Sequence, residues 1–262
     1  PRKVPMKIFP AVHYSMGGVW VDYDQMTNIP GIFAAGEVDY SQHGANRLGA
    51  NSLLSAIYGG LVAGPKAIEY IEGLEKHADE MPSSLFEAKV KEEEEAFEAL
   101  LKMDGTENAY VLHQELGQWM TDNVTVVREN PRLLKTDEKI QELLERWKNI
   151  SINDTSKWSN QGVMFTRQLK NMLHLARVIT LGAYHRDESR GAHYKPEFPE
   201  RNDEDFLKTT IAEFDTENQE PKFSYEDVDV SLIPPRKRDY TKKSSHTPPT
   251  PPEKNENEGS KQ

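Results

Sequence analysis

Four stretches with helical periodicity are the feature that most limits how this chain can fold. They cover residues 82–103, 108–122, 136–150 and 160–187. The short connections between them favour a bundle of three or four antiparallel helices. Thr136, Asp137 and Glu138 are expected in the first turn of the third helix, where acids complement the helix dipole. The run of glutamates at 92–95 is expected on a solvated helix face.

The first seventy residues are apolar and rich in glycine, unlike the charged stretch that follows. Residues 8–22 predict a strand, a Gly-Gly turn and a second strand, because the Val-Trp-Val run at 19–21 favours β structure. After a turn signal at Pro30-Gly31, the run Ile32–Ala35 predicts a short buried strand that leads into Gly36.

Residues from Asn51 to about Ile71 predict a helix with Ser52 as its N-cap. Only small or apolar residues occur over its first three turns, and a helix that is apolar nearly all round is expected to be buried. Glycines inside a helix lower its stability, so close packing against another backbone is the expected reason for Gly59, Gly60 and Gly64.

From Gly191 onward the pattern becomes irregular. A strand pair is predicted around residues 206–214 and 221–232. The last residues, 244–262, have no large aliphatic or aromatic side chain and are predicted to be disordered.

The composition excludes several classes of function. A formal net charge of −11 argues against non-specific nucleic-acid binding, because a phosphate backbone attracts basic surfaces. The chain has no cysteine, so disulfides and thiolate-bound metal clusters are excluded. The histidines show no metal-binding spacing, and no metal is assigned. No apolar run is long enough to span a bilayer, and the abrupt start without Met suggests a missing upstream portion.

Arg47 is the first candidate for a functional residue. The flanking pairs Gly44-Ala45 and Gly49-Ala50 leave room for a ligand, and a guanidinium suits a bound carboxylate or phosphate. The free N–H groups at residues 51–53 would offer a second anion site. Two structural alternatives are a guanidinium that bridges loop carbonyls and one that pairs with an acid such as Glu37.

His13 and Glu37 are weaker candidates. His13 precedes the Gly17-Gly18 pair, which lets the chain pass close to a ligand, and a histidine can donate to a carboxylate. Glu37 follows the predicted strand at 32–35, where ligands gather in open α/β sheets. It can accept from a ribose or ribityl hydroxyl, or it can be an ordinary ion-pair partner.

Five motifs together resemble one family. They are HYSMGGVWVD, GIFAAGEV, HGANRLGANSLL, DESRGAHYKPEFPERNDEDFLK and PRKRDYT, in this order, and they extend to about Thr241. The sequence is similar to the carboxy-terminal half of the flavoprotein subunit of succinate dehydrogenase and fumarate reductase. L-aspartate oxidases share the first four motif types.

The resemblance implies roles for individual residues. In the family a C4 dicarboxylate lies against FAD, and a hydride moves between a substrate carbon and the flavin. His13 and Arg47 match the substrate-binding histidine and arginine. Glu37 matches the acid that binds FAD, and the helix opening that follows lies on the flavin side. The remaining expected residues are Asn51, Ser52 and Leu53 for cofactor binding, and Tyr14, Gly36, Arg190 and His193 as neighbours that support the site.

The resemblance also implies a fold and a domain order. The expected fold is part of an α/β flavin-binding domain, then an α-helical bundle domain, then an irregular, partly β region. The expected segments are 1–10 as the end of a substrate-capping domain, 11–75 as the last part of the FAD-binding domain, 76–190 as the bundle domain, 191–243 as an extended region and 244–262 as a disordered tail.

The family's dinucleotide motif, covalent flavin-attachment histidine and arginine proton shuttle all lie upstream of the matching region. This chain alone is therefore expected neither to hold FAD tightly nor to turn over. The implied partners are an iron–sulfur subunit and a membrane anchor subunit, which would hold the protein at the cytoplasmic face of a membrane. Fumarate reductase, L-aspartate oxidase and a non-catalytic helical docking module are the alternatives to succinate dehydrogenase.

Overall fold

The structure is a computed structural model that describes residues 13–236. The predictions for the start of the first strand, for the end of a capping domain at 1–10 and for the tail at 244–262 lie outside these residues. The described residues up to Asp227 form one compact unit, and those from Val228 onward belong to a second one. The domain boundaries expected at 75/76 and 190/191 stay predictions.

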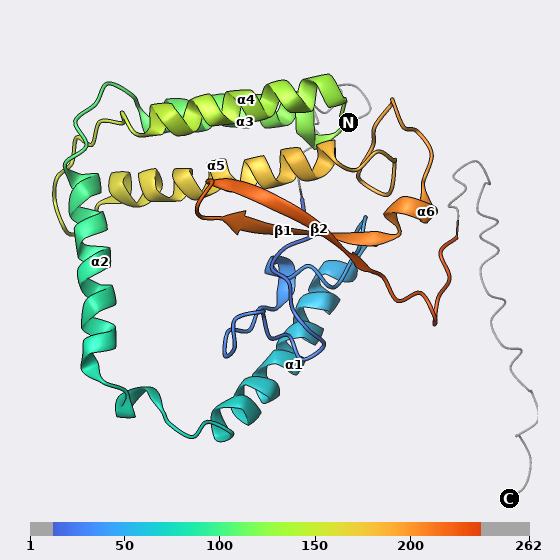
Figure 1. The fold of residues 1–262 in the computed structure, drawn as a ribbon, viewed down its shortest axis with the longest axis horizontal. Helices are drawn as coiled ribbons and strands as arrows, with labels where there is room; N and C mark the ends of the chain where they lie inside the picture. The colour runs from blue at the N-terminus through green and yellow to red at the C-terminus, as the bar shows by residue number, and fades with distance from the viewer. Residues whose placement is uncertain (1–12, 237–262) are drawn as a thin grey trace, which may run out of the picture. The chain divides into compact units, whose positions relative to one another are not determined.

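The described chain is mainly helical with one small antiparallel sheet (Figure 1). The helices are α1 (Asn51–Glu72), α2 (Ser83–Leu101), α3 (Ala109–Met120), α4 (Asn130–Trp147), α5 (Gln161–Tyr184) and the short α6 (Asp203–Phe206). The 3-10 turns are η1 (Gly36–Val38) and η2 (Ala78–Glu80), and η3 (Thr121–Thr125) is a π-helical turn. The strands are β1 (Lys208–Asp215) and β2 (Glu220–Asp227).

The main hydrophobic core lies between α3, α4 and α5, which run alongside one another (Figure 1). Apolar residues at helical spacing on the three helices supply most of it, as their periodicity predicts. Its buried members are Ala109, Leu112, Leu116, Ile140, Leu143, Ile150, Leu169, Leu173 and Ala176. The predicted helical bundle is therefore confirmed for these helices, and α2 packs on α5.

Side-chain caps set the first residues of α3 and α5. The Asn108 side chain accepts hydrogen bonds from the backbone N–H groups of Tyr110 and Val111, and Asn160 accepts from Val163. Each cap satisfies N–H groups that have no partner within the helix. Both helices consequently begin within one residue of the predicted start.

The predicted start of α4 is wrong by six residues. The helix begins at Asn130, and Pro131 in its first turn has a φ angle suited to that position. Thr136 and Asp137 therefore lie in the middle of the helix and are buried, rather than complementing the dipole of a first turn. Asp137 faces α5 and forms an ion pair with Arg177, with 2.8 Å between Oδ1 and Nε.

The predicted strand pair near the carboxyl end is confirmed. β1 and β2 pair antiparallel, with Lys208 opposite Asp227 and Asp215 opposite Glu220. The hairpin packs on α5 through aromatic contacts, in which the Phe214 ring meets His174 edge-on at 4.9 Å between centroids. The glutamate run at 92–95 lies on the outer side of α2, as predicted, although Glu93 also pairs with Arg167 of α5.

The strands predicted near the amino end do not form a sheet in the described part of the chain. Val19 makes a single parallel bridge to Asp39, and Phe33 makes a single antiparallel bridge to Met26. The run at 32–35 then leads into η1 instead of a ladder. An isolated strand has no partner for its backbone groups, so the described residues alone provide no α/β sheet.

Three expectations for α1 are corrected. Its N-cap is Ala50, in the left-handed region at φ 61°, and Ser52 lies inside the first turn. The helix is also not buried, because only Ser55 and Gly59 are covered. Gly59 packs tightly as predicted, since a Cβ there would lie 3.4 Å from the backbone nitrogen of Gly36, but the prediction is wrong for Gly60 and Gly64, where a Cβ would meet no atom within 4 Å. Its exposed apolar residues include Leu53, Leu54, Ile57, Tyr58, Leu61, Ile68 and Ile71.

Candidate functional site

Arg47 lies over the ring of Tyr14. Its guanidinium carbon is 5.5 Å from the ring centroid, a geometry that favours attraction between a cation and the π face. Nη1 donates a hydrogen bond to the carbonyl of the adjacent Leu48, at 3.1 Å. Within residues 13–236 no acid pairs with Arg47, so the alternative of an ion pair with Glu37 is wrong.

The predicted residue His13 immediately precedes Tyr14 in the chain. His13 is exposed, and no hydrogen bond or ion pair of its side chain occurs in the part of the chain that the structure describes. His13 therefore adjoins, through the backbone, the residue whose ring contacts Arg47. The assignment of His13 and Arg47 to a substrate stays a prediction.

Glu37 lies in η1 and is exposed. Its Oε1 accepts a hydrogen bond from the backbone N–H of Ser15 at 2.9 Å. This bond holds the segment after Tyr14 against η1, so the first two motifs meet in the structure. Gly36, which starts η1, is buried at φ 85°, a region that disfavours other residues.

The amino end of α1 follows Arg47 by four residues. No side chain caps it, so the first-turn amides of Ser52 and Leu53 have no side-chain acceptor. The expectation of a free N–H group at Asn51 is wrong, because this group donates to the carbonyl of Leu48 at 3.2 Å. A Cβ built on Gly44 or Gly49 meets no atom within 4 Å, so open space lies beside these two positions. An uncapped helix start beside open space is suited to an anionic or electron-rich ligand.

The loop at residues 190–193 contacts the Arg47 loop through its backbone. The N–H of Ala192 donates to the carbonyl of Ala45 at 2.9 Å. Gly191, at φ 60°, comes so close that a Cβ there would lie 2.3 Å from the same oxygen. Only glycine fits this position, and the contact connects the segment after α5 to the segment before α1.

Arg190 belongs to a buried ion-pair network on the other side of this loop. Its Nε and Nη2 donate to the two carboxylate oxygens of Glu188, at 2.8 and 2.9 Å. Burial raises the pKa of Glu188, but hydrogen bonds from Arg190, from the Asn202 backbone and from Arg186 outweigh burial, and its pKa lies below the ordinary value. Glu188 is thus a buried carboxylate held ionised by two arginines.

His193 is buried and hydrogen-bonded through both ring nitrogens. Nε2 lies 2.9 Å from the carbonyl of Arg186 and must donate to it, so Nδ1 accepts from Arg128 at 2.6 Å. Burial lowers the pKa of His193 to about 4, and the charges of Arg128 and Lys195 act in the same direction. The ring therefore stays neutral and supports the loop instead of exchanging protons near neutral pH.

Sequence reasoning overlooked His43 and Ser55. The Nε2 of His43 lies 3.1 Å from Oγ of Ser55, and its ring meets Tyr14 edge-on at 4.9 Å between centroids. The spacing of the histidines gives His43 no role as a metal ligand and points to no other role. Its place in the same motif as Arg47 was the signal that could have identified it, because both side chains reach one aromatic ring.

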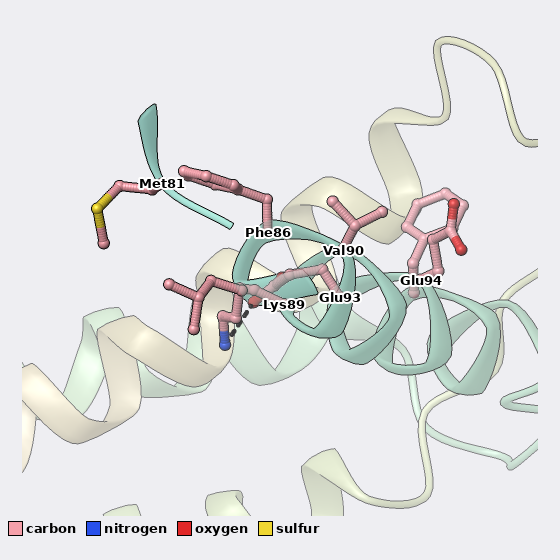
Figure 2. Close-up of a pocket in the computed structure, with 8 residues that line it drawn as sticks. Met81, Phe86, Lys89, Val90, Glu93 and Glu94 are labelled. Atoms are coloured by element: carbon pink, nitrogen blue, oxygen red, sulfur yellow. Dashed lines mark ion pairs between the residues drawn. The ribbon is translucent and has the colours of Figure 1, made fainter. Parts of the chain in front are cut away.

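An apolar groove of about 700 Å³ runs along α2, away from the predicted site residues. Figure 2 shows Phe86 and Val90 projecting from one side of the helix, beside the ion pair of Lys89 and Glu93. All its lining residues come from 81–97, and none is a predicted site residue.

Two further findings concern residues 13–236. They contain no cluster of three or more histidine, aspartate or glutamate side chains placed to hold a metal ion. No helix among them is both long and apolar enough to cross a bilayer.

Two family models match the chain. Residues 1–53 match the FAD binding domain, and residues 113–240 match the fumarate reductase flavoprotein C-terminal domain. The first match includes His13, Glu37 and Arg47, and the second includes the loop at 190–193.

Individual relatives agree with these models. The succinate dehydrogenase flavoprotein subunit of Bacillus subtilis is 74% identical over 93% of this chain and 42% of its own length. Among solved structures, a variant of the quinol fumarate reductase FrdA of E. coli superposes with a TM-score of 0.83 at 35% identity, over 90% of this chain and 40% of the other. Sdh1 of Mycobacterium smegmatis superposes with a TM-score of 0.72 at 28% identity, over 86% and 36%. The chain spans about two fifths of the length of these proteins.

Proposed function

The chain belongs to the succinate dehydrogenase and fumarate reductase flavoprotein family, and on that premise we propose that it forms part of a flavoprotein that oxidises succinate to fumarate. The match to the FAD binding domain indicates FAD as the cofactor. One observation carries the proposal: Arg47 lies over Tyr14, which follows His13, close in sequence to the uncapped start of α1. Two motifs thus bring a cation and an imidazole to one region.

The described residues fit part of a FAD site. The uncapped first turn of α1 would offer the Ser52 and Leu53 amides to the flavin, and its dipole would favour negative charge there. Glu37 is exposed in η1, and its Oε1 accepts a hydrogen bond from the Ser15 N–H. Its carboxylate would also accept a hydrogen bond from a hydroxyl of the cofactor. When bound, FAD would accept a hydride from the substrate.

Arg47 and His13 would bind the substrate. Arg47 has guanidinium donors beyond the one used on Leu48, and parallel N–H groups suit a carboxylate. His13 would donate to the second carboxylate of the same dicarboxylate. Groups that hold both ends of a C4 diacid orient its central bond, and orientation of this kind lowers a barrier by several kcal/mol in favourable cases.

The direction of the reaction is part of the proposal. The chain is 74% identical to a succinate dehydrogenase subunit, whereas the fumarate reductase subunits of Haemophilus influenzae and E. coli are 38% and 36% identical. This difference favours succinate oxidation over fumarate reduction. An L-aspartate oxidase would instead turn over aspartate when aspartate replaces succinate in the kinetic assay described below.

The proposed partners are an iron–sulfur subunit and a membrane anchor subunit. Residues 1–262 contain no cysteine, so they cannot supply the thiolates that hold iron–sulfur clusters, and we assign the clusters to a separate subunit. We place the protein at the cytoplasmic face of a membrane through these partners. Co-purification with a cluster-containing subunit tests this assignment.

Substitution of Arg47 tests the proposed function. The test uses a chimera in which this chain replaces the region of the Bacillus subtilis subunit that it matches, assembled with the partners of that subunit. Arg47→Ala should lower kcat/KM for succinate about 100-fold, because it removes charge-assisted hydrogen bonds to a carboxylate. Arg47→Lys, which keeps the charge and loses the planar fork, should lower it less.

The binding of malonate, a dicarboxylate that the enzyme cannot oxidise, provides a second measurement. Calorimetric titration of the FAD-loaded chimera should show weaker binding after Arg47→Ala and after His13→Ala. Unchanged affinity for malonate and unchanged kcat/KM would overturn the proposed function and leave the helical docking module as the alternative.

A further inference from the structure

The Tyr14 ring contacts one of the two residues proposed to bind the substrate and adjoins the other in the chain. The Arg47 guanidinium lies over its face at 5.5 Å, and His13 is the preceding residue. Displacement of the ring would remove the contact surface of Arg47. The position of this ring therefore bears on the orientation of Arg47.

A histidine from the Arg47 motif also contacts the ring. His43 meets Tyr14 nearly perpendicular, at 84° between planes and 4.9 Å between centroids. Edge-to-face contacts of this kind are directional, because the positive edge of one ring meets the negative face of another. Tyr14 thus contacts both His43 and Arg47.

Ser55 anchors His43 to α1. Ser55 is buried, and its hydroxyl donates its single proton to the Ser52 carbonyl at 2.9 Å. Nε2 of His43 lies 3.1 Å from the same Oγ, within hydrogen-bond distance. The chain of contacts runs from the first turns of α1 through His43 to Tyr14.

The loop itself offers Arg47 little other support. Within residues 13–236, its guanidinium makes one hydrogen bond, to the neighbouring Leu48 carbonyl, and no ion pair. Gly44 and Gly49 stand on either side with open space around them, and Gly44 has φ 53°. The backbone of the loop is fixed at Ala45 by Ala192, so the Tyr14 ring is the contact that bears on the side chain of Arg47.

We propose that His43, anchored by Ser55, is a positioning residue that holds the Tyr14 ring and thereby sets Arg47 and His13 for a dicarboxylate. The inference rests on the proposed function and adds to it a pair of residues that act through Tyr14. His43 acts through packing and one hydrogen bond, with no proton transferred.

The test compares variants in the chimera at equal FAD content. His43→Ala should raise KM for succinate and Kd for malonate about 10-fold, with a smaller effect on kcat, because a misplaced arginine weakens binding before it affects the reacting bond. Ser55→Ala should act in the same direction and less strongly. His43→Phe keeps an aromatic edge beside Tyr14 and should recover part of the lost affinity.

His113 provides a matched control in α3. Its ring meets Phe165 edge-on at 5.4 Å between centroids, the same kind of contact placed in the bundle. His113→Ala should leave KM for succinate and Kd for malonate unchanged. If His43 had only a structural role, its loss would lower the flavin content or the melting temperature and leave both constants of the FAD-loaded fraction unaltered.

Two outcomes separate this inference from the proposed function. If His43→Ala leaves Kd for malonate within about twofold of the parent while Arg47→Ala weakens it strongly, the inference is wrong and the proposed function stands. If neither substitution changes malonate binding, the proposed function fails and the inference fails with it.

Discussion

At the scale of single residues, the loop around Glu188 shows how buried charge can be tolerated. Glu188 has no exposed side-chain surface, yet Arg186 and Arg190 donate to it and the Asn202 backbone adds a third donor. A buried carboxylate is costly unless such donors satisfy it. The network stabilises the conformation of the loop at 190–193, and in this conformation Gly191 packs closely against Ala45.

The buried His193 predicts an acid-sensitive stability. Its ordinary pKa is about 6.5, and burial lowers its pKa to about 4 in the folded chain. Between these values the unfolded chain binds a proton that the folded chain does not, so the free energy of unfolding falls as pH decreases. The stabilising contribution is complete above about pH 6.5, and about 3 kcal/mol of it is lost by pH 4.

Urea unfolding of the parent and of His193→Gln at several pH values measures this contribution. An amide can replace both hydrogen bonds of the ring and does not titrate. The variant should therefore lose less stability than the parent between pH 6.5 and 4. Equal losses in the two proteins would show that His193 is not the group responsible.

At the scale of elements, one buried ion pair joins α4, α5 and the hairpin. Nε of Arg177 lies 2.8 Å from Oδ1 of Asp137, and its Nη1 donates to the carbonyl of Gln219 in the turn between β1 and β2. Gln141 also donates to Asp137 at 2.7 Å. The pair specifies the relative arrangement of α4, α5 and the hairpin. Apolar packing alone would be less specific, because it is not directional.

Removal of Asp137 should destabilise the bundle strongly. Both side chains of the pair are only 10% exposed, so Asp137→Ala leaves the Arg177 guanidinium buried without its partner. The expected loss is about 3–5 kcal/mol in the free energy of unfolding, measured with urea. The double variant Asp137→Leu with Arg177→Met should recover most of it, because no buried charge remains.

The exposed pair Lys89 and Glu92 of α2 provides the control. Their side chains are 61% and 68% exposed, and Glu92→Ala should change stability by at most about 1 kcal/mol. An Asp137→Ala variant no less stable than this control would contradict the role given to the buried pair.

At the scale of the whole molecule, the buried core is unevenly distributed along the chain. The two apolar clusters lie in the segment from α3 to α5. In the described segment before α1, Val21 is the one buried apolar residue. α1 and α5 are of similar length, yet α5 has eight buried residues and α1 has two.

Hydrogen exchange of this chain should reveal the difference. Backbone amides of α5 should exchange at least about 100-fold more slowly than those of α1, because local opening of α1 exposes little buried apolar surface. Mass spectrometry of peptides from the two helices, corrected for intrinsic exchange rates, measures the ratio. Similar protection in both helices would mean that α1 is stabilised by contacts the structure does not contain.

Local sequence patterns determined the helical bundle, the hairpin and, to within one residue, the starts of α3 and α5. These features depend on local spacing of apolar residues and on short-range hydrogen bonds, both of which are visible in the sequence. The family resemblance, carried by five ordered motifs, is confirmed by the matches to known proteins. The same local signals misplaced the start of α4, because Asp137 pairs with Arg177 of α5 and does not lie in a first helical turn.

Only the tertiary structure decided which side chains meet around Arg47. Tyr14, His43 and Ser55 come from three separate positions in the chain, and no pattern in the sequence encodes a contact between distant segments. The exposure of α1 could not be predicted either. An apolar sequence shows that a helix can be buried, but it does not show whether another segment packs against it. Local interactions can be inferred from neighbouring residues, whereas contacts between segments depend on the path of the whole chain.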